Sequence, residues 1–346
     1  MSAYHGIGRV SEREDRISRS KQYHNGRFRN TYPMRPIGGP SLKLMGEFFF
    51  GGAKRVPRKP LPVENPIPTW QTPPKSGLRV TSIGHSTLVF EIDGVRLLTD
   101  PVFSNYAAPF ALPGRKRFHP APVKIEELPR IDAIIQSHDH YDHLSRTSWK
   151  RIAKLGIPVV TSLGVGKRLE KFGVAPDLIT EVDWWESYTI PGTSVTVTAT
   201  PAQHFSGRSL GDRNLTLWSS WVIAGPSNRI FFSADTGLTD ELEQIALRHG
   251  PFDLTLLEIG ASNPAWADIH LGPVNAMRAF EMLGGGTLMP IHWGTFDLAL
   301  HPWNEPVETL LSLKKPAGSK IITPPFGRPV EPSMVAEPTR WWQSLE

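Results

Sequence analysis

The most constraining feature of the sequence is a run of metal-ligating side chains, His-Asp-His-Tyr-Asp-His, at residues 138–143. The run follows residues 131–135, a short apolar stretch rich in isoleucine that predicts a buried β-strand. A strand that opens into a loop can present closely spaced imidazoles to one point. Only 12 of the 346 residues are histidine, so three within six positions are poorly explained as a chance polar loop. The run therefore predicts a metal site at the end of a strand.

Three further candidate ligands, His204, Asp235 and His292, each lie just past the end of a predicted strand. A lone histidine in such a place is commonly a surface or core group, but the shared placement favours a common site. The chain has no cysteine, so any metal must be bound by imidazole and carboxylate, which suits zinc and also manganese or iron. The candidate metal ligands are His138, His140, Asp142, His143, His204, Asp235 and His292.

Strands dominate the rest of the chain, with helices between them. Residues 78–90 and 95–99 predict two strands separated by Asp93-Gly94, a strong hairpin signal. Residues 273–283 predict a helix. Further strands are predicted at residues 158–160, 195–200, 217–224, 229–233, 254–259 and 287–291. This pattern favours an α/β (α+β) chain in which two sheets pack face to face with helices outside.

Basic residues are concentrated at the amino-terminal end. Residues 1–75 carry 14 Lys or Arg and 5 Asp or Glu, whereas the whole chain has a net charge of only +5. Proline and glycine are dense between residues 33 and 74, which predicts an irregular segment lying on a folded domain. We therefore divide the chain into a basic, Pro/Gly-rich extension at 1–77 and a catalytic domain at 78–346. The apolar patch at 42–50 is expected to pack on that domain, with membrane contact as the alternative.

The location and the macromolecular partners are predicted from what the sequence does not show. No apolar run approaches the roughly 20 residues that span a bilayer, and residues 1–10 do not read as a signal peptide, so cytoplasmic residence is expected. The basic segment is compatible with peripheral contact to an anionic membrane surface. No module with stacking aromatics along a positive track is evident, so nucleic acid is not expected as a partner.

The run at 138–143 resembles the metal motif of the metallo-β-lactamase superfamily. Further segments are similar to the branch that contains N-acyl-phosphatidylethanolamine phospholipase D and its bacterial relatives. The resemblance extends from about residue 25 to about residue 306, although ascorbate-phosphate lactonase-like relatives carry segments similar to His-Trp-Gly-Thr-Phe. These segments are NGRFRN at 25–30, GHST at 84–87, LTDP at 98–101, PAQH at 201–204, ADTG at 234–237 and IHWGTF at 291–296.

The resemblance implies a four-layer αββα sandwich with the site at one edge, between the sheets. It also implies two divalent metal ions, with Zn²⁺ as the first choice and Mn²⁺ or Fe as alternatives, and a homodimer. The ligand set it implies is His138, His140 and His204 for one metal, Asp142, His143 and His292 for the other, and Asp235 as the bridge.

The implied activity is that of a phosphodiesterase of the N-acyl-phosphatidylethanolamine phospholipase D type, acting on a phospholipid or other phosphodiester through a metal-bridging hydroxide. Asp142 is also expected to orient the water. His270 is expected to protonate the leaving group or contact the substrate, with a surface histidine near a helix N-terminus as the alternative. Asp100 is expected to bond a metal-ligand imidazole or to be a strand-end turn residue, and His85 to be buried and structural.

Three other functions compete with this one. A soluble lactonase or sugar-phosphate hydrolase of the ascorbate-6-phosphate lactonase-like type predicts a small polar pocket instead of an apolar groove. A metal-dependent nuclease is compatible with the basic segment. A non-enzymatic scaffold on the same fold is disfavoured, since a binding module does not need seven correctly placed ligands.

Overall fold

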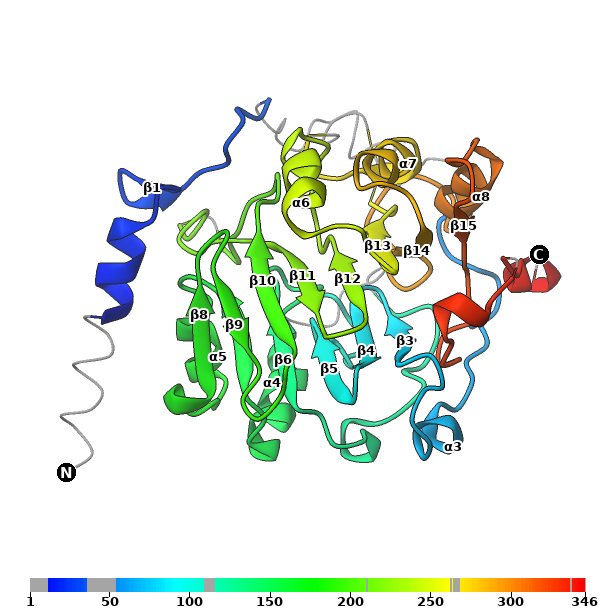
Figure 1. Ribbon diagram of the computed structural model, residues 1–346, viewed down its shortest axis with the longest axis horizontal. Helices are drawn as coiled ribbons and strands as arrows, with labels where there is room; N and C mark the ends of the chain where they lie inside the picture. The colour runs from blue at the N-terminus through cyan, green and yellow to red at the C-terminus, as the bar shows by residue number, and fades with distance from the viewer. Residues whose placement is uncertain are drawn as a thin grey trace.

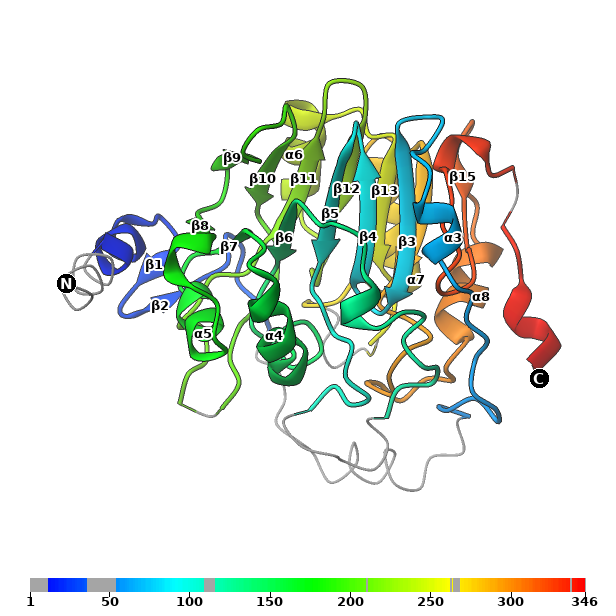
Figure 2. The ribbon, with the colours of Figure 1, turned by 90° about the horizontal axis from the view of Figure 1, so that it is seen from below.

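The structure is a computed structural model that describes residues 12–35, 54–108, 116–209, 211–261, 263, 268–336 and 338–345. Two β-sheets pack face to face, and helices cover their outer faces (Figures 1 and 2). This arrangement confirms the predicted αββα sandwich. The apolar patch at 42–50 lies outside the described residues, so its predicted packing is not addressed by the structure.

The first sheet has six strands in the order β3-β4-β5-β6-β7-β8. β3 to β5 form an antiparallel meander, and β5 to β8 run parallel. Helices α4 (Arg146–Ile152) and α5 (Gly166–Lys171) connect its parallel strands and cover its outer face. The strands are β3 (Leu78–Gly84), β4 (Thr87–Ile92), β5 (Val95–Thr99), β6 (Ala133–Gln136), β7 (Val159–Ser162) and β8 (Ile179–Val182).

The second sheet has seven strands in the order β15-β14-β13-β12-β11-β10-β9. β9 to β12 are antiparallel, whereas β12 to β15 are parallel and their connections include helices α6 (Glu241–His249), α7 (Gly272–Met282) and α8 (Glu305–Ser312). The strands are β9 (Ser187–Thr189), β10 (Thr196–Thr200), β11 (Ser220–Ala224), β12 (Arg229–Phe232), β13 (Leu254–Glu258), β14 (Thr287–Ile291) and β15 (Lys320–Ile321).

The alternating direction of apolar side chains along the strands explains how the layers are held together. In β12, Ile230 and Phe232 join the apolar cluster between the two sheets, whereas Phe231 joins the cluster under the outer helices. Successive side chains of a strand point to opposite faces, so a strand that is apolar on both faces is suited to a layer covered on both sides. The helix predicted at 273–283 and the strand predicted at 287–291 correspond to α7 and β14.

The prediction of one continuous strand at residues 78–90 was wrong. β3 ends at Gly84 and β4 begins at Thr87, so the chain reverses direction at His85 and Ser86. His85 has a positive φ of 59°, and its backbone N–H donates a hydrogen bond to Thr295 Oγ1 at 2.8 Å. A tertiary contact therefore sets a backbone conformation that the unbroken apolar pattern does not record.

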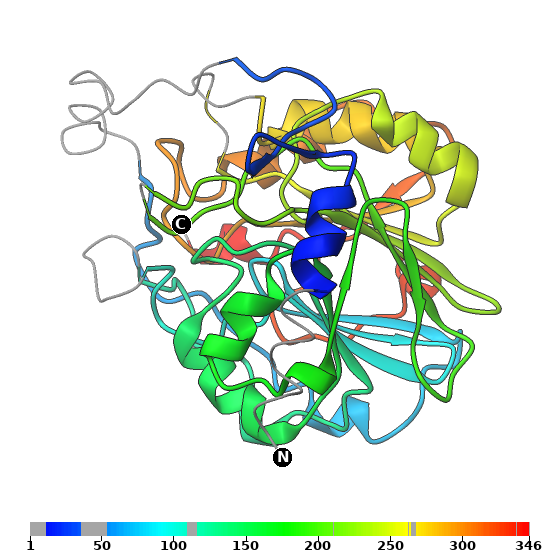
Figure 3. The same cartoon turned by 90° about the vertical axis from the view of Figure 1, so that its left-hand side faces the viewer.

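The described parts of the basic amino-terminal segment lie on this sandwich. A helix over residues 12–19 lies beside α5 (Figures 2 and 3). Its Arg13 forms ion pairs with Glu170 at 2.5 Å and with Glu181. Further along, Trp70 of the short helix α3 (Ile67–Trp70) is buried, and its indole N–H donates to Thr81 Oγ1 at 3.1 Å. The division of the chain into an extension and a catalytic domain stays a prediction.

A two-stranded hairpin follows the helix over residues 12–19. It consists of β1 (Tyr23–His24) and β2 (Arg27–Phe28). Short 3₁₀ turns complete the described structure at Ile125–Glu127, Ala153–Leu155, Pro176–Leu178, Pro332–Met334 and Trp341–Leu345. Among the described helices, none is both long enough and apolar enough to span a bilayer.

Candidate metal centre

The seven predicted ligands come together at one edge of the sandwich, where strands of both sheets end. Parallel strands have their carboxyl ends at the same edge, so the loops that follow them meet there. The ligands lie on four loops: the loop after β6 (His138, His140, Asp142 and His143), the loop after β10 (His204), the loop after β12 (Asp235) and the loop after β14 (His292).

The loop after β6 is shaped by its own hydrogen bonds. The Gln136 side-chain amide donates to the carbonyls of His138 at 2.8 Å and His143 at 3.3 Å, while Trp149 Nε1 donates to its oxygen at 3.0 Å. The backbone N–H of Leu144 donates to the His140 carbonyl at 2.7 Å. These bonds curl the loop so that its imidazoles face one region.

Four non-glycine residues at the site have backbone angles that such residues rarely adopt. A positive φ of this kind costs on the order of 1–3 kcal/mol per residue and persists only where the surroundings enforce it. The four residues are His85 (59°), Asp100 (34°), Ala234 (48°) and His292 (63°). Each lies just after the strand that carries it, so the surrounding structure holds these strand ends in the conformation that directs them to the site.

One cluster consists of three histidines and a carboxylate. His140 Nδ1 lies 3.0 Å from His138 Nε2 and 3.1 Å from His204 Nε2. Asp235 Oδ2 lies 3.9 Å from His138 Nε2 and 3.7 Å from His204 Nε2. Ligands about 2.0–2.1 Å from a tetrahedral zinc are separated by about 3.4 Å, so these four atoms fit one ion.

The second cluster contains Asp142, His143 and His292. Asp142 Oδ2 lies 3.7 Å from His143 Nε2 and 3.4 Å from His292 Nε2. The other carboxylate oxygen of Asp235, Oδ1, lies 3.1 Å from His143 Nε2 and 3.3 Å from His292 Nε2. Asp235 therefore presents one oxygen to each cluster, which is the arrangement expected of a bridging carboxylate.

His85 also belongs to this second cluster. Its Nε2 lies 3.0 Å from Asp142 Oδ2, and its ring lies 3.8 Å from that of His292. Burial, together with the charge of His292, lowers the pKa of His85 to about 3, so the neutral ring donates its Nε2 proton to Asp142. The expectation of a buried His85 is met, but sequence reasoning missed its contact with a candidate ligand.

The chemistry of these side chains fits divalent cations. His143 Nε2, His292 Nε2 and Asp235 Oδ1 are buried and lack a well-formed hydrogen bond to any described residue. Burial opposes the protonation of His292, yet Asp235 and then Asp142 raise its pKa to about 10. The two buried carboxylates thus require positive charge beside them, and a cation with neutral imidazole ligands satisfies that requirement.

A second layer of hydrogen bonds holds the ligands in place. Asp100 Oδ2 accepts a hydrogen bond from His143 Nδ1 at 2.7 Å and another from Ser137 Oγ at 2.6 Å. His138 Nδ1 lies 2.9 Å from the same Ser137 Oγ. Outer partners of this kind fix the tautomer and the orientation of a ligating imidazole. Of the two roles expected for Asp100, a bond to a candidate-ligand imidazole and a strand-end turn, the structure shows the bond to His143.

His270 lies beside both clusters without belonging to either of them. Its Nδ1 is 3.0 Å from Glu258 Oε1, which also accepts the backbone N–H of Leu271 at 2.9 Å. Its ring lies 5.2 Å from that of His204 and 5.5 Å from that of His292. The structure therefore places His270 at the edge of the site. Sequence reasoning gave no sign of its carboxylate partner, which lies 12 residues earlier at the end of β13.

Asp139 is a residue of the motif to which sequence reasoning assigned no role. Its carboxylate accepts a hydrogen bond from the Gly207 backbone at 2.8 Å and from Arg168 Nε at 3.2 Å. Arg208 donates to its carbonyl at 2.6 Å. Asp139 therefore anchors the motif loop to α5 and to the loop after β10.

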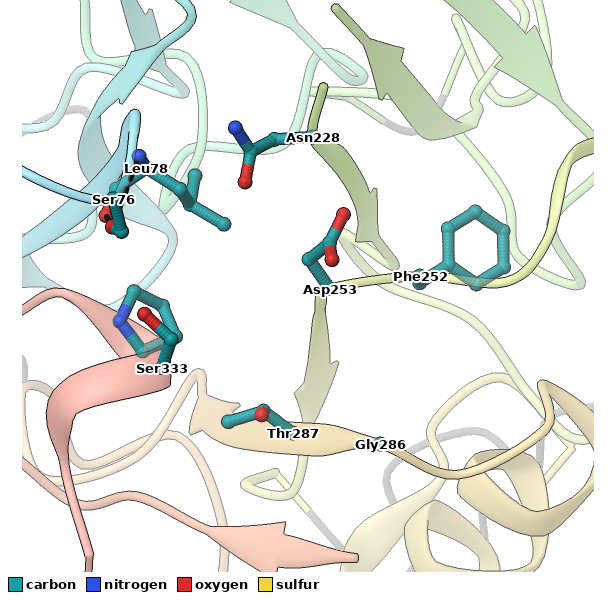
Figure 4. A pocket seen from close by; sticks show the side chains of 9 residues that line it. Ser76, Leu78, Asn228, Phe252, Asp253, Gly286, Thr287 and Ser333 are labelled. Carbon is teal, nitrogen blue, oxygen red and sulfur yellow. Dashed lines mark hydrogen bonds between the residues drawn. The ribbon is translucent and has the colours of Figure 1, made fainter.

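The opposite edge of the sandwich holds a different kind of depression. A pocket of about 360 Å³ opens near the starts of β3, β13 and β14, as Figure 4 shows. Its described lining contains one carboxylate, Asp253, and no histidine. Asp253 accepts the backbone N–H of Arg229 at 2.7 Å. This edge therefore offers no competing metal site in its described lining.

The chain matches known proteins over most of its length. Residues 95–293 match the family described as "Beta-lactamase superfamily domain". An uncharacterized protein of Mycobacterium tuberculosis is 43% identical over 94% of this chain and 88% of its own. N-acyl-phosphatidylethanolamine-hydrolyzing phospholipase D 1 of Caenorhabditis elegans is 37% identical over 71% of each chain.

Solved structures agree on the fold. The isothiocyanate hydrolase from Delia radicum gut bacteria superimposes with a TM-score of 0.60 at 22% identity, covering 73% of this chain and 98% of that one. At such low identity, this likeness concerns the fold alone. The sequence matches and the two His/Asp clusters show that the chain belongs to the metallo-β-lactamase superfamily of metal-dependent hydrolases and is a relative of the N-acyl-phosphatidylethanolamine-hydrolyzing phospholipases D.

Proposed function

We propose that the protein is a dinuclear phosphodiesterase that hydrolyses glycerophospholipids of the N-acyl-phosphatidylethanolamine class. The observation that carries this proposal is the position of Asp235, whose two oxygens face two separate clusters of ligand atoms. Two cations bound in these neighbouring clusters would be suited to in-line displacement at phosphorus. The similarity to a phospholipase D that acts on this lipid supports the choice of substrate.

The proposed ligand set follows the geometry. When bound, the two cations would lower the pKa of a water molecule and stabilise negative charge on the phosphate oxygens. We propose zinc, because imidazole and carboxylate are its ligands in chains that lack cysteine, with manganese or iron as alternatives. The residues that would hold the ions are His138, His140 and His204 on one side, Asp142, His143 and His292 on the other, and Asp235 between them.

Two side chains are proposed to handle the water and the proton. Asp142 is held by His85 and would orient the attacking water. His270, with Nδ1 bonded to Glu258, would carry the transferable proton on Nε2. As the water oxygen bonds to phosphorus and releases a proton to solvent, the bond from phosphorus to the alcohol oxygen would break. That oxygen would take the proton of His270, which solvent then restores. The products are a phosphatidate and an N-acylethanolamine.

The surroundings of His292 are mixed in polarity. A narrow crevice of about 20 Å³ begins at His292, and its lining includes Phe118 and Trp293 together with the ion-paired Arg55 and Asp297. A lining of this kind fits both an apolar chain and a polar group, so the choice of a lipid rests on the similarity to the phospholipase D and not on this crevice. A soluble lactonase or sugar-phosphate hydrolase is the second candidate, because the metal ligands alone do not choose between these substrates.

We propose that the reaction takes place at a membrane surface. The basic amino-terminal segment supports peripheral contact with an anionic membrane surface, and we expect the protein to act there from the cytoplasm. We also propose a homodimer, on the family resemblance alone. Nucleic acid is not proposed as a partner.

The test combines metal analysis with a graded set of substrates. Protein loaded with zinc, manganese or iron is assayed on bis(p-nitrophenyl) phosphate, then on N-acyl-phosphatidylethanolamine and phosphatidylcholine in vesicles, and finally on lactones and sugar phosphates. Release of N-acylethanolamine by protein with two metals per chain is expected. Two metals with hydrolysis of lactones or sugar phosphates alone would establish the second candidate. Failure to bind metal after reloading would contradict both.

A further inference from the structure

We infer that Asn30, a residue of the amino-terminal segment, is a positioning residue that holds His204 in the metal centre. The Asn30 side chain bonds the main chain of His204 at both polar groups. Its Nδ2 donates to the His204 carbonyl at 2.8 Å, and its Oδ1 accepts the His204 N–H at 3.0 Å. These two bonds join residues 174 positions apart in the sequence.

The orientation of the Asn30 amide is fixed by a third partner. Trp218 Nε1 donates to Asn30 Oδ1 at 3.0 Å and also to the Ala202 carbonyl at 2.9 Å. An amide oxygen that faces two N–H donors, with its nitrogen facing a carbonyl, satisfies all three groups in only one of its two flips. The Trp218 side chain is buried and Asn30 is half-buried, so the network joins the amino-terminal segment to the edge of the interior.

The ring of His204 is held separately from its backbone. Its Nδ1 donates to the Ile269 carbonyl at 2.9 Å, which leaves Nε2 to face His140 and Asp235. With the backbone held by Asn30 and the ring held by Ile269, the donor atom has a defined position. Loss of the hydrogen bonds from either Asn30 or Ile269 would let His204 Nε2 move relative to the other ligand atoms.

The hairpin formed by β1 and β2 brings Asn30 to this place. Phe28 is buried in a cluster with Ala202, Leu217 and Trp218, and its backbone N–H donates to the Asn214 carbonyl at 2.8 Å. Gln203, the neighbour of His204, donates through its side chain to the Tyr32 carbonyl at 3.2 Å. The amino-terminal segment therefore packs against the loop that carries one metal ligand.

Docking of the hairpin and binding of one metal are then thermodynamically linked. A ligand that binds only the docked state stabilises that state, and docking in turn raises the affinity for the ligand. The linkage concerns the ion that His138, His140 and His204 would hold. The inference rests on the proposed metal centre, but it does not depend on which substrate is hydrolysed.

The experiment measures metal binding and not turnover. Asn30→Ala removes all three bonds, and Asn30→Asp keeps the volume while replacing the donor to the His204 carbonyl by an oxygen. Arg29→Ala, at an exposed neighbouring residue, is the matched control. Competition with a chelator gives the two dissociation constants, and the absorption spectrum of the Co²⁺-substituted protein reports ligand geometry.

For both Asn30 variants we expect one of the two metals to bind about 10–100-fold more weakly, with a changed Co²⁺ spectrum. The other metal and the Arg29→Ala protein should match the wild type. Asn30 variants that retain both affinities and the wild-type spectrum would overturn the inference. These outcomes are separate from the proposed function, since a protein that binds two metals normally and hydrolyses no phosphodiester leaves them unchanged.

A proteolysis experiment on the wild-type protein tests the same inference without the Asn30 variants, in case these variants fail to fold. If docking and metal binding are linked, metal-loaded protein should resist trypsin at Lys21, Arg27 and Arg29 more strongly than chelator-treated protein. Rates of cleavage at these three sites are compared with the rate at Lys314, an exposed residue beyond α8. Equal protection with and without metal would refute the linkage.

Discussion

Asp235 differs from the other candidate ligands because its two oxygens serve different clusters. Oδ1 faces His143 and His292, whereas Oδ2 faces His138 and His204 at longer distances. Each candidate-ligand histidine lies in only one of the two clusters that Asp235 joins, although His138 and His143 also lie near Asp100. If the clusters hold ions as proposed, loss of the Asp235 charge should affect both ions, whereas loss of one imidazole should affect mainly one.

Asp235→Asn is expected to lower the metal content below two ions per chain and to reduce kcat/KM by about 100-fold or more, because both ions lose the same anionic ligand. Elemental analysis and the bis(p-nitrophenyl) phosphate assay measure the two effects. Asp253→Asn is the matched control, since that carboxylate bonds the Arg229 backbone at the opposite edge of the sandwich. Two full equivalents of metal in the Asp235 variant would argue against a bridging role.

His270→Gln separates proton transfer from metal binding. The side chain lies beside the clusters and bonds Glu258, so we expect normal metal content and a fall in kcat of about 100-fold on a phospholipid. The deficit should be much smaller on bis(p-nitrophenyl) phosphate, because p-nitrophenolate leaves without a proton. A deficit of equal size on both substrates would show that His270 does not donate the proton.

At the scale of elements, apolar strands are predictable from the sequence and most short helices are not. The strand at residues 287–291 matches β14 because β14 is buried along its whole length and reads as a continuous apolar run. Helix α6 escapes prediction because only Leu242 and Ile245 are buried in it. The turn at His85 is missed because Thr295, 210 residues away, holds its backbone.

The helix layer contributes stability through a few buried side chains. Phe280→Ala in α7 should lower the free energy of unfolding by about 3–5 kcal/mol, since it removes a buried ring from the outer cluster. Val274→Ala in the same helix is the control, because Val274 is 48% exposed. Urea titrations followed by circular dichroism measure the difference. Equal losses in the two variants would contradict this account of the layer.

At the scale of the whole molecule, the sequence predicts the layers and the ligand types but not how distant segments meet. The ligand types follow from the spacing at 138–143 and from the strand ends before His204 and His292. The bond between Asn30 and His204 has no local signal, because only the folded chain brings the hairpin to that loop. Contacts of this kind depend on three-dimensional packing and not on a periodic pattern.

Removal of metal should destabilise the whole chain. Each site held at 100 times its dissociation constant adds about 2.7 kcal/mol to the stability of the folded state, so chelation should lower the Tm by several degrees. Differential scanning calorimetry with and without chelator measures the shift, and return of the original Tm on adding zinc is the control. An unchanged Tm would indicate that the ligands do not bind metal in the folded protein.

The two sheets contribute unequally to the metal centre. The loop after β6 belongs to one sheet, whereas His204, Asp235 and His292 belong to the other. In the Co²⁺-substituted protein, the distance between the two paramagnetic ions would therefore depend on how the two sheets are aligned. Since packed layers move by small sliding displacements, a slip along the strands would alter the magnetic coupling of the ions before any secondary structure is lost. Core substitutions far from the ligands would become detectable through that coupling alone.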